Sequence, residues 1–518
     1  MMHWCRSWSR RTALSSAIML LIGPGLVLAA PRAAHAAVRA DGAAANGATG
    51  SATAQYEAYL RRFGRERIVA GARAANDRIN IAAHRQRAIP AFARKYNLPC
   101  SACHTVWPQL NNFGQVFRDN GYRLKNERDS PIDQAPGYWP AAARITPQFR
   151  VDRSDHQPVD AVPGDPASGQ VEKTITQSGF DLSGIDLLMI GTLSKRISFG
   201  LIPAAESDGS WHIEAAYVRF NDLMNTTWAN LKAGKFELDN MVSEKRELLL
   251  SGNGGFYQSY HFVPAGDATT FGIGDNQIGM ELSGHSINSY TRYSAGVFSS
   301  TDGEVGLPQG RGYDGAVAFS QAFDAGTLGL ERIGVFGYRG SRPTTFETLD
   351  GEPVPSTGLN TKPFYRAGAS GDLFFGNLEL LPLWMHAEDD VALATGSFGG
   401  APIPDGAQSP TWNAGLLEAH YYIGHQFVLL GRRESVRMSK QALPDTPSDF
   451  GNIDATALGF RYYPIMLSRT GLAIHGEYSW SNTIGTAPLS EIGSGEPPLD
   501  PGTSVKSSSI FMALDFAF

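Results

Sequence analysis

Residues 471–481 read GLAIHGEYSWS, a stretch in which bulky apolar residues alternate with small, polar or charged ones. Successive side chains of a β-strand point to opposite faces, so this alternation gives the stretch two different faces. One face carries Leu472, Ile474, Gly476, Tyr478 and Trp480, and the other carries Ala473, His475, Glu477, Ser479 and Ser481. A polar, charged face opposite an apolar one suits a wall between lipid and a wet interior, which predicts a strand of a transmembrane β-barrel.

The same alternation recurs from residue 143 to residue 518, in short segments bounded by Gly, Asn, Ser or Pro. We count about sixteen such segments, an even number that a closed outer-membrane barrel can have. We therefore predict an all-β transmembrane barrel of antiparallel strands over residues 143–518. The predicted strands lie near 144–152, 182–193, 196–203, 211–221, 228–238, 277–286, 289–299, 312–323, 328–338, 363–374, 377–388, 411–421, 425–437, 453–464, 469–481 and 506–518.

The connections between these segments alternate between short turns and long loops. The short turns include Ser194-Lys195, Phe375-Gly376 and Ser468-Arg469. The long loops include 153–181, 239–276, 339–362, 389–410 and 482–505. Short periplasmic turns facing long outer loops are typical of outer-membrane barrels, and they place both ends of the barrel on the periplasmic side. The alternative, a large soluble all-β protein, gives no reason for loops to be sorted in this way.

The composition excludes two further classes of protein. Of the 518 residues, 42% are hydrophobic, which is too many for an intrinsically disordered chain. After the first forty residues no run approaches the ~20 apolar residues that a membrane-spanning helix needs, so a polytopic helical membrane protein is excluded as well.

The N-terminus has the features of an export signal, with three early arginines, an apolar stretch and a small-residue cleavage site at Ala34-His35-Ala36. We expect export through the inner membrane and removal of residues 1–36, Cys5 included. The alternative is an uncleaved anchor helix. Residues 37–88 are interpreted as a linker followed by a basic segment with a loose helical pattern, and we assign them no function.

The chemistry of the chain centres on Cys100-Ser101-Ala102-Cys103-His104. Cys-x-x-Cys-His is the attachment sequence of c-type haem, in which two thiols bond to the porphyrin and the adjacent histidine becomes an axial ligand of the iron. A thioredoxin-like pair would need a βαβ context, and zinc would need a second Cys or His cluster nearby. A plain disulfide would leave the histidine without a role. We therefore predict one covalent haem c held by Cys100 and Cys103, with His104 as the metal ligand.

The second axial ligand of the iron is not determined by the sequence. Every methionine after the signal peptide lies at residue 189 or beyond, within the predicted barrel. His84 precedes the motif on a segment with helical tendency, and His156 begins the first outer loop. A solvated surface histidine is the competing interpretation for both. A five-coordinate iron, or a ligand from the barrel wall, stays open.

A helix is predicted after the motif, because Leu110, Phe113 and Phe117 share one helical face. Pro108 suits the start of that helix, and Gly121 suits its C-terminal cap. Residues 89–142 are therefore predicted to form a small α-helical cytochrome c module in front of the barrel.

Several stretches of this module can be compared with a known family. They are Ile89-Pro90-Ala91-Phe92-Ala93-Arg94-Lys95-Tyr96, the haem motif, Phe113-Gly114 and Phe117-Arg118-Asp119-Asn120-Gly121-Tyr122. Together with the order of signal, one-haem segment and barrel, they resemble the fused monohaem cytochrome–porins of bacterial outer membranes, of the iron-oxidiser type. The specific similarity covers the forty-odd residues around the motif, and the basic stretch 56–88 departs from the short N-terminus of that family.

The resemblance implies an electron conduit in the bacterial outer membrane rather than a substrate-converting enzyme. Its partners would be an extracellular donor, notably Fe²⁺, periplasmic carriers such as soluble cytochromes, and outer-membrane lipid, with no nucleic acid. The module would be periplasmic or inside the barrel. The alternatives are a haem-bearing nutrient or anion porin, supported by basic strand residues such as Arg219 and Lys232, a haem sensor, and a haem enzyme such as a peroxidase.

The predicted outer loops are strongly acidic. The eight loops hold nine Lys or Arg and twenty-five Asp or Glu, a net charge of −16. A field of that sign concentrates cations such as Fe²⁺ at the mouth of the barrel. Solubility and divalent-cation bridging at the membrane surface are the competing explanation of this charge.

Overall fold

The structure, a computed structural model, describes most of the chain after residue 90. The described residues are 91–96, 98, 100–125, 129, 140–205, 210–246, 248–249, 258–264, 266–308, 310, 312–326, 328–424, 426–466, 470–484 and 504–517. The predicted signal peptide, segment 37–88 and His84 lie outside this part of the chain.

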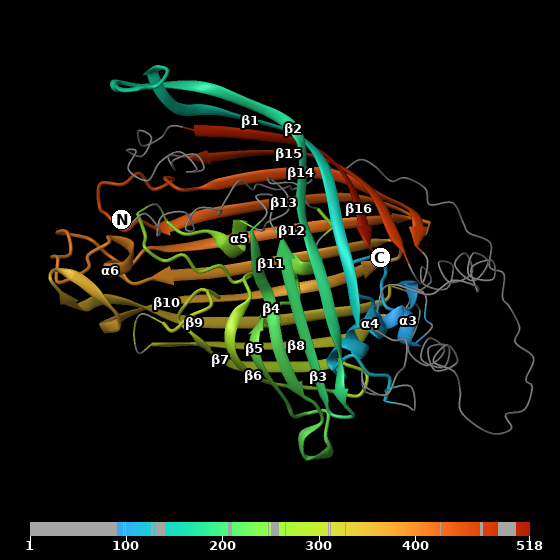
Figure 1. Ribbon diagram of the computed structural model, residues 1–518. Coiled ribbons are helices and arrows are strands. Elements are labelled where there is room, and N and C mark those ends of the chain that lie inside the picture. The colour runs from blue at the N-terminus through green and yellow to red at the C-terminus, as the bar shows by residue number, and fades with distance from the viewer. Residues whose placement is uncertain are drawn as a thin grey trace, which may run out of the picture.

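Sixteen antiparallel strands close into a barrel, as the alternation predicts (Figure 1). Each strand pairs with its neighbour in the sequence, and β16 returns to pair with β1, with Arg144 opposite Ala517. The strands are β1 (Ala141–Val162), β2 (Asp165–Ser194), β3 (Ile197–Ala205), β4 (Trp211–Phe220), β5 (Asn230–Phe236), β6 (Gln277–His285), β7 (Thr291–Ser299), β8 (Tyr313–Asp324), β9 (Leu330–Leu349), β10 (Glu352–Phe375), β11 (Leu378–Asp389), β12 (Thr411–Ile423), β13 (Phe427–Lys440), β14 (Ile453–Met466), β15 (Gly471–Ile484) and β16 (Ser504–Ala517).

The two faces of the wall carry opposite chemistry. On β16, Ile510, Met512 and Leu514 are 44–48% exposed on the outside, whereas Phe511 and Asp515 are 1% exposed on the inside. The same division holds around the barrel: its exterior carries Val, Leu, Ile, Phe, Tyr and Trp, and most of its buried charged side chains face the lumen. This is the reverse of a soluble protein and the arrangement expected of a barrel surrounded by lipid.

The two ends of the barrel differ. The first and last strands begin and end at the rim that carries the short turns, which we call the short-turn end, and the opposite rim is the long-loop end. The prediction of long loops at 153–181 and 339–362 was wrong. Most of these residues extend the strands instead, since strand pairing continues as far as Val162 with Asp165 and Leu349 with Glu352. The distal parts of both hairpins are exposed to solvent, so they lack the apolar alternation that reveals a strand. The tip of the β1–β2 hairpin projects at the top left of Figure 1.

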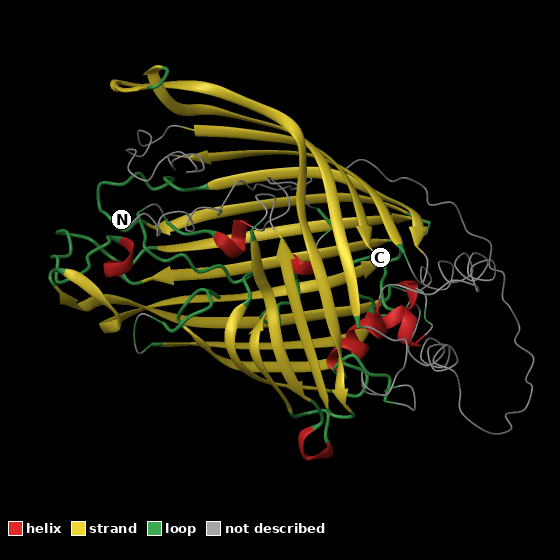
Figure 2. Ribbon diagram, viewed as in Figure 1, coloured by secondary structure: helices red, strands yellow, loops and turns green. Residues whose placement is uncertain are grey.

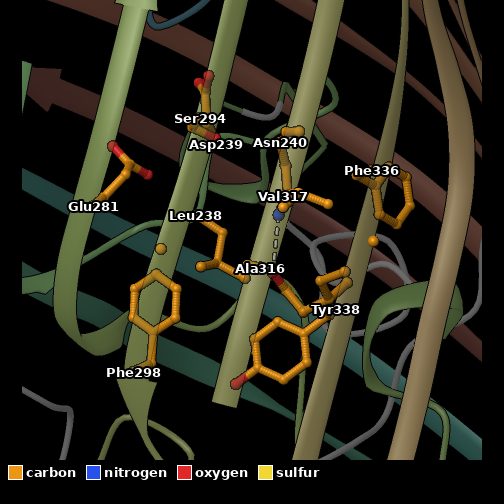
Figure 3. A pocket seen from close by; sticks show the side chains of 14 residues that line it. Leu238, Asp239, Asn240, Glu281, Ser294, Phe298, Ala316, Val317, Phe336 and Tyr338 are labelled. Atoms are coloured by element: carbon orange, nitrogen blue, oxygen red, sulfur yellow. Dashed lines mark hydrogen bonds between the residues drawn. The ribbon is translucent and has the colours of Figure 1, made fainter. Parts of the chain in front are cut away.

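The predicted outer loop 239–276 was wrong, because the described residues between β5 and β6 enter the barrel. We call these residues, 237–246, 248–249, 258–264 and 266–276, the lumen segment. The lumen segment contains two short helices, η4 (Glu244–Arg246) and α5 (Gln258–His261), which lie in the space enclosed by the strands in Figure 2. Between this segment and strands β6–β9 is a cavity of about 10 Å³, lined by Leu238, Asp239 and Tyr338 among others (Figure 3). Such a volume admits about one water molecule, so the segment packs closely against the wall.

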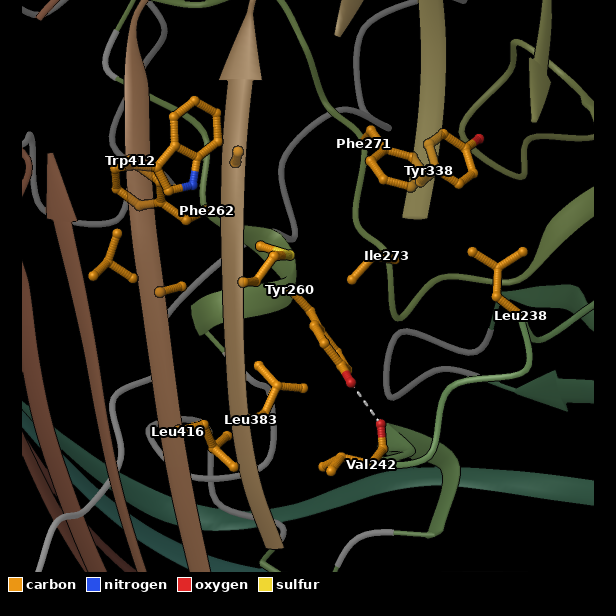
Figure 4. Close-up of a cluster of buried hydrophobic side chains, with 14 of the residues drawn as sticks. Leu238, Val242, Tyr260, Phe262, Phe271, Ile273, Tyr338, Leu383, Trp412 and Leu416 are labelled. Atoms are coloured by element: carbon orange, nitrogen blue, oxygen red, sulfur yellow. Dashed lines mark hydrogen bonds between the residues drawn. The ribbon is translucent and has the colours of Figure 1, made fainter. Parts of the chain in front are cut away.

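Aromatic and aliphatic side chains fill the space between the lumen segment and the wall (Figure 4). The Tyr260 hydroxyl donates to the Val242 carbonyl at 2.8 Å and so ties α5 to the start of the segment. The rings of Phe271 and Tyr338 stack with centroids 4.1 Å apart. Burial of these apolar groups is the main force that folds the segment inward.

The described N-terminal segment, residues 91–125, lies at the short-turn end of the barrel (Figure 1). It contains α3 (Ala91–Tyr96), the 3₁₀ turn η1 (Cys100–Ala102) and α4 (Asn112–Asp119). Its aromatic core contains Phe92, Tyr96, Phe113, Phe117 and Tyr122. No helix among the described residues is long and apolar enough to cross a membrane.

The helix predicted after the motif is confirmed, but its predicted start at Pro108 was wrong. Helix α4 begins at Asn112, because the Asn111 side chain caps it by accepting from the Gly114 amide at 2.9 Å. The predicted cap is confirmed: Gly121 has φ +70°, a conformation that favours glycine. A Cβ at Gly121 would also collide with the Asn221 side chain at the end of β4, so the glycine permits a close contact with the wall.

Candidate functional site

The three predicted haem-binding residues are brought together by one turn of backbone. The amides of Cys103 and His104 both donate to the Cys100 carbonyl, at 3.1 and 3.0 Å. This turn places the two cysteines three residues apart around η1, directly followed by the histidine.

Both cysteines are partly buried thiols. Burial raises the pKa of the Cys100 thiol to about 11 and that of Cys103 to about 12, so both are neutral at ordinary pH. Two neutral thiols on one turn fit the covalent attachment of a porphyrin, which converts each of them into an uncharged thioether.

The His104 imidazole is oriented through one ring nitrogen. Its Nδ1 lies 3.1 Å from the Pro108 carbonyl oxygen and 3.2 Å from that of Gln109, which assigns the proton to Nδ1. Burial lowers the pKa of His104 to about 4, so the ring is neutral and its Nε2 carries a lone pair. Metal-binding histidines are typically held in this way, with the second nitrogen donating to a carbonyl. The side chains present therefore fit a haem.

Two residues that the sequence analysis did not single out hold this turn in place. The Asn111 side chain, besides capping α4, donates to the carbonyls of Ser101 and Ala102 at 3.3 and 3.2 Å. Gly114 lies so close to the Cys103 carbonyl that an added Cβ would be 2.1 Å from its oxygen. An asparagine just before a helix is a recognised cap signal, and it could have revealed Asn111.

The turn at residues 100–104, which we call the haem turn after the predicted cofactor, is in contact with the barrel wall. Cys100 and Trp107 pack, together with Val106 of the same segment, against buried apolar side chains of the wall and of the lumen segment, namely Leu248, Leu249, Tyr422, Val428, Leu430, Ala457, Tyr463 and Ala473. The Tyr463 hydroxyl donates to the Trp107 carbonyl at 2.8 Å. The site is therefore enclosed partly by the N-terminal segment and partly by β12–β15.

Gln109 links the carbonyl beside His104 to the wall. Its side-chain amide donates to Glu379 Oε1 at 2.6 Å, and its side-chain oxygen accepts from the Tyr422 hydroxyl at 2.9 Å. The backbone carbonyl of the same residue is a partner of His104 Nδ1. One residue thus connects the candidate iron ligand to β11 and β12.

The end of α4 is bound to the opposite part of the wall. Arg219, predicted as a basic lumen residue, does face the lumen, where it donates to the carbonyls of Arg118 and Asp119 at 2.9 and 2.6 Å. Lys232, predicted with it, also faces inward and pairs with Glu281 at 2.8 Å. Both cations therefore have partners within the barrel.

The lumen segment meets the N-terminal segment through charged side chains. Arg118 lies 3.5 Å from Glu237, and Arg246 of the lumen segment binds the same carboxylate at 3.0 Å. A cavity of about 40 Å³ lies beside this contact, between α4 and strands β4–β7. Among the described residues, the lumen near α4 is thus filled by the N-terminal segment from the short-turn end and by the lumen segment from the long-loop end.

Of the two histidines considered as the second axial ligand, the structure describes only His156. His84 lies outside the described residues, so its role stays a prediction. His156 is a residue of β1, with Nδ1 3.1 Å from Asp155. It lies fifteen residues along β1 from Ala141, or about 50 Å at the rise of an extended strand. Because β1 starts at the short-turn end, His156 is far from the haem turn, and its half-exposed side chain agrees with the interpretation as a solvated surface histidine.

Among the described residues, no group of three or more His, Cys, Asp or Glu side chains has the geometry of a metal site.

No protein-family model matches the chain, and no curated protein matches it. Among solved structures, the barrel is similar to the outer membrane protein OmpT of Vibrio cholerae, with 11% identity and a TM-score of 0.40 over 72% of this chain and 99% of that one. It is also similar to the anion-selective porin from Comamonas acidovorans, with 13% identity and a TM-score of 0.42 over 73% and 99% of the two chains. A third similar structure is the outer membrane channel DcaP of Acinetobacter baumannii, with 11% identity and a TM-score of 0.43 over 73% of this chain and 97% of that one. Likenesses this distant carry no functional argument, and the sixteen-stranded closure rests on the strand pairings above.

Proposed function

We propose that this chain is an outer-membrane electron conduit that carries one haem c on Cys100 and Cys103, with His104 as an axial ligand. The observation that carries the proposal is the state of the haem turn. It combines two neutral thiols and a neutral imidazole whose Nδ1 is already bonded, seated against the wall at the short-turn end of the barrel.

The placement in a membrane is supported by the exterior of the barrel. Large apolar side chains such as Met280, Val317 and Trp384 are more than half exposed along the strands. Such a surface is stable next to lipid and unstable in water. Outer-membrane lipid is therefore the expected surroundings of the barrel, with its short-turn end on the periplasmic side.

The residues of the site have distinct roles in this proposal. The cysteines would hold the porphyrin and the Nε2 of His104 would bind its iron, and the group would supply a one-electron couple. Pro108 and Gln109 orient the imidazole, and Asn111 holds the turn that carries it. The apolar side chains around Cys100 exclude water from one side of the site. Electrons would pass between an extracellular donor such as Fe²⁺ and periplasmic carriers such as soluble cytochromes.

A haem-bearing porin is the alternative, because a sixteen-stranded barrel of this kind can also enclose an aqueous channel. The described lumen argues against a wide channel. The lumen segment and the wall bury Trp412, Phe262 and their neighbours together, and Arg219 and Lys232, the cations expected to attract anions, have partners of their own.

The proposal is tested with the full-length exported chain, purified in detergent and reconstituted into liposomes that contain an electron acceptor. Addition of Fe²⁺ outside should reduce the enclosed acceptor, and a Cys100→Ala/Cys103→Ala variant should abolish this while inserting normally. Absence of covalent haem in the unmodified protein would overturn the proposal. Passage of ions or nutrients without electron transfer would favour the porin.

A further inference from the structure

A continuous chain of buried polar side chains leads from the haem turn into the wall. Glu379 accepts from Gln109 at 2.6 Å, and its other oxygen lies 2.8 Å from Nδ1 of His420. Nε2 of His420 lies 2.6 Å from Glu418, whose second oxygen accepts from Arg432 at 2.7 Å. The four wall side chains are at most 2% exposed.

The contacts of His420 define its protonation. A neutral imidazole has one N–H and one lone pair, so it can donate to only one of two carboxylates. Both ring nitrogens of His420 face carboxylate oxygens at hydrogen-bond distance. The geometry therefore gives the Glu379–His420–Glu418 group a high affinity for one extra proton. With that proton, the charges of Glu379, His420, Glu418 and Arg432 sum to zero. Without it, a net negative charge is buried, which costs free energy.

The surroundings increase this demand for a proton. Lumen-facing carboxylates lie on the neighbouring strands, and Asp372 interacts directly with Glu379. Among the described residues, the titratable and charged groups that interact with the cluster are Asp372 on β10, Tyr422 on β12 and Glu434 on β13, and Arg332 on β9 acts on Asp372. Acids outnumber bases in this set, so the cluster is an acidic region that favours the bound proton.

The cluster is coupled to the haem turn through one residue. Gln109 offers its carbonyl to His104 and its side-chain amide to Glu379, so two hydrogen bonds separate the imidazole from the carboxylate. A change of charge at the iron would therefore act on the cluster through a short, buried and polar route, where the low dielectric strengthens the interaction.

We propose that Glu379, His420 and Glu418 form a redox-linked proton site, which takes up one proton from water when the haem is reduced and releases it when the haem is oxidised. This inference rests on the proposed function. In the balanced step, one electron from the external donor converts ferric to ferrous iron while one proton binds the carboxylate–imidazole group. Electron transfer through the barrel is then accompanied by proton movement at its inner wall.

The test is a redox titration of the purified full-length protein at pH 5 to 9. The potential of the haem should fall as pH rises, with a slope approaching 59 mV per pH unit, the value of a tenfold change in a one-electron equilibrium. Reduction in weakly buffered solution with an indicator dye should show uptake of up to one proton per electron.

His420→Gln and Glu379→Gln should flatten the pH dependence and abolish proton uptake while leaving the haem attached. Glu281→Gln is the matched control, because Glu281 is an equally buried lumen carboxylate that pairs with Lys232 on another part of the wall. A pH-independent potential in the unmodified protein would overturn the inference and leave the conduit intact. A retained slope in both cluster variants would also overturn it. Absence of any haem couple would overturn both proposals.

Discussion

The guanidinium of Arg292 on β7 donates two hydrogen bonds to the carboxylate of Asp119, from Nε to Oδ2 at 2.8 Å and from a terminal nitrogen to Oδ1 at 3.2 Å. Asp119 is the last residue of α4, so a wall residue holds the helix that follows the haem turn. Burial acts against ionisation of Asp119, yet Arg292 and His285 keep its pKa below the usual value. Arg292 also binds Asp239 at 2.7 Å, so one side chain joins the wall, the N-terminal segment and the lumen segment.

Arg292→Gln should loosen the N-terminal segment from the barrel. Removal of one partner of a buried ion pair typically costs about 3–5 kcal/mol, because the remaining charge is left without compensation. Limited proteolysis should then cut within residues 91–125 at much lower protease concentrations, while the barrel keeps its heat-modifiable migration. Arg366→Gln is the control, since its equally buried pair with Asp389 joins only the neighbouring strands β10 and β11. Equal protection of both variants would mean that α4 is held by its apolar contacts alone.

Cys100→Ala together with Cys103→Ala should remove covalent haem and leave a folded barrel. The backbone hydrogen bonds of the barrel are satisfied by its own closure, so they do not depend on a cofactor. Haem staining of a denaturing gel and heat-dependent migration measure the two properties separately. Failure of the variant to insert would show that the haem-bearing segment is required for folding of the barrel.

His104→Ala should change the haem spectrum and potential strongly, whereas His156→Ala should change neither. His104 lies on the haem turn, and His156 lies far along β1 beside Asp155. His84→Ala completes the comparison, since that residue is still a candidate for the second axial ligand. Conversion from a low-spin to a high-spin spectrum by His84→Ala alone would identify it as that ligand.

The barrel could be predicted from the sequence because each side chain of a wall strand faces either lipid or the lumen. Apolar and polar side chains therefore alternate along a strand, as in β15, where Tyr478 and Trp480 are exposed on the outside and His475 and Glu477 are buried inside. The inward course of the lumen segment was missed because a loop has no such period. Apolar residues in a supposed outer loop, such as Phe262, Phe271 and Ile273, were the available signal that it is buried.

The juxtaposition of Cys100, Cys103 and His104 could be predicted because the three residues lie within five positions of the sequence. Its contact with the wall was not predictable, because Gln109 and Glu379 are 270 residues apart and meet only after the barrel has closed. The sequence marks Glu379 as one of many inward charges and contains nothing that pairs it with Gln109.

The lumen segment should become less stable between neutral and alkaline pH. Burial alone would lower the pKa of His261, but the carboxylates of Glu244 and Asp275 raise it to about 9. Because the folded pKa lies above the unfolded value of ~6.5, this stabilisation is complete below about pH 6.5 and is lost as pH rises through 9. Hydrogen exchange of residues 258–264, corrected for intrinsic rates, should accelerate over this range. His261→Gln should remove the pH dependence, and His386→Gln on the outer face should preserve it.

Electron transfer from Fe²⁺ should slow as ionic strength rises from ~0.01 to ~0.15 M, because the screening length falls from ~30 to ~8 Å. The structure changes which acidic residues can produce this effect. In the predicted outer loop 389–410, Asp389 is buried against Arg366 and Asp390 caps helix α6 (Val391–Ala394), so neither is a free surface charge. Glu491 and Glu496, in the predicted outer loop 482–505, lie outside the described residues. Asp239 and Glu244 belong to the lumen segment, where Glu244 is buried and Asp239 is bound to Arg292.

We therefore choose four exposed acids of the long-loop end to neutralise, Glu347, Glu352, Asp445 and Asp449. Their replacement by Gln or Asn should weaken the salt dependence of electron transfer without altering the haem spectrum, since they lie at the rim opposite the haem turn. An anionic donor such as ferrous citrate should show the reverse salt dependence in the unmodified protein, because screening then relieves repulsion. If the rates with both donors were insensitive to salt, the loop charge would serve the membrane surface instead, and the attraction of Fe²⁺ by this face would lose its electrostatic basis.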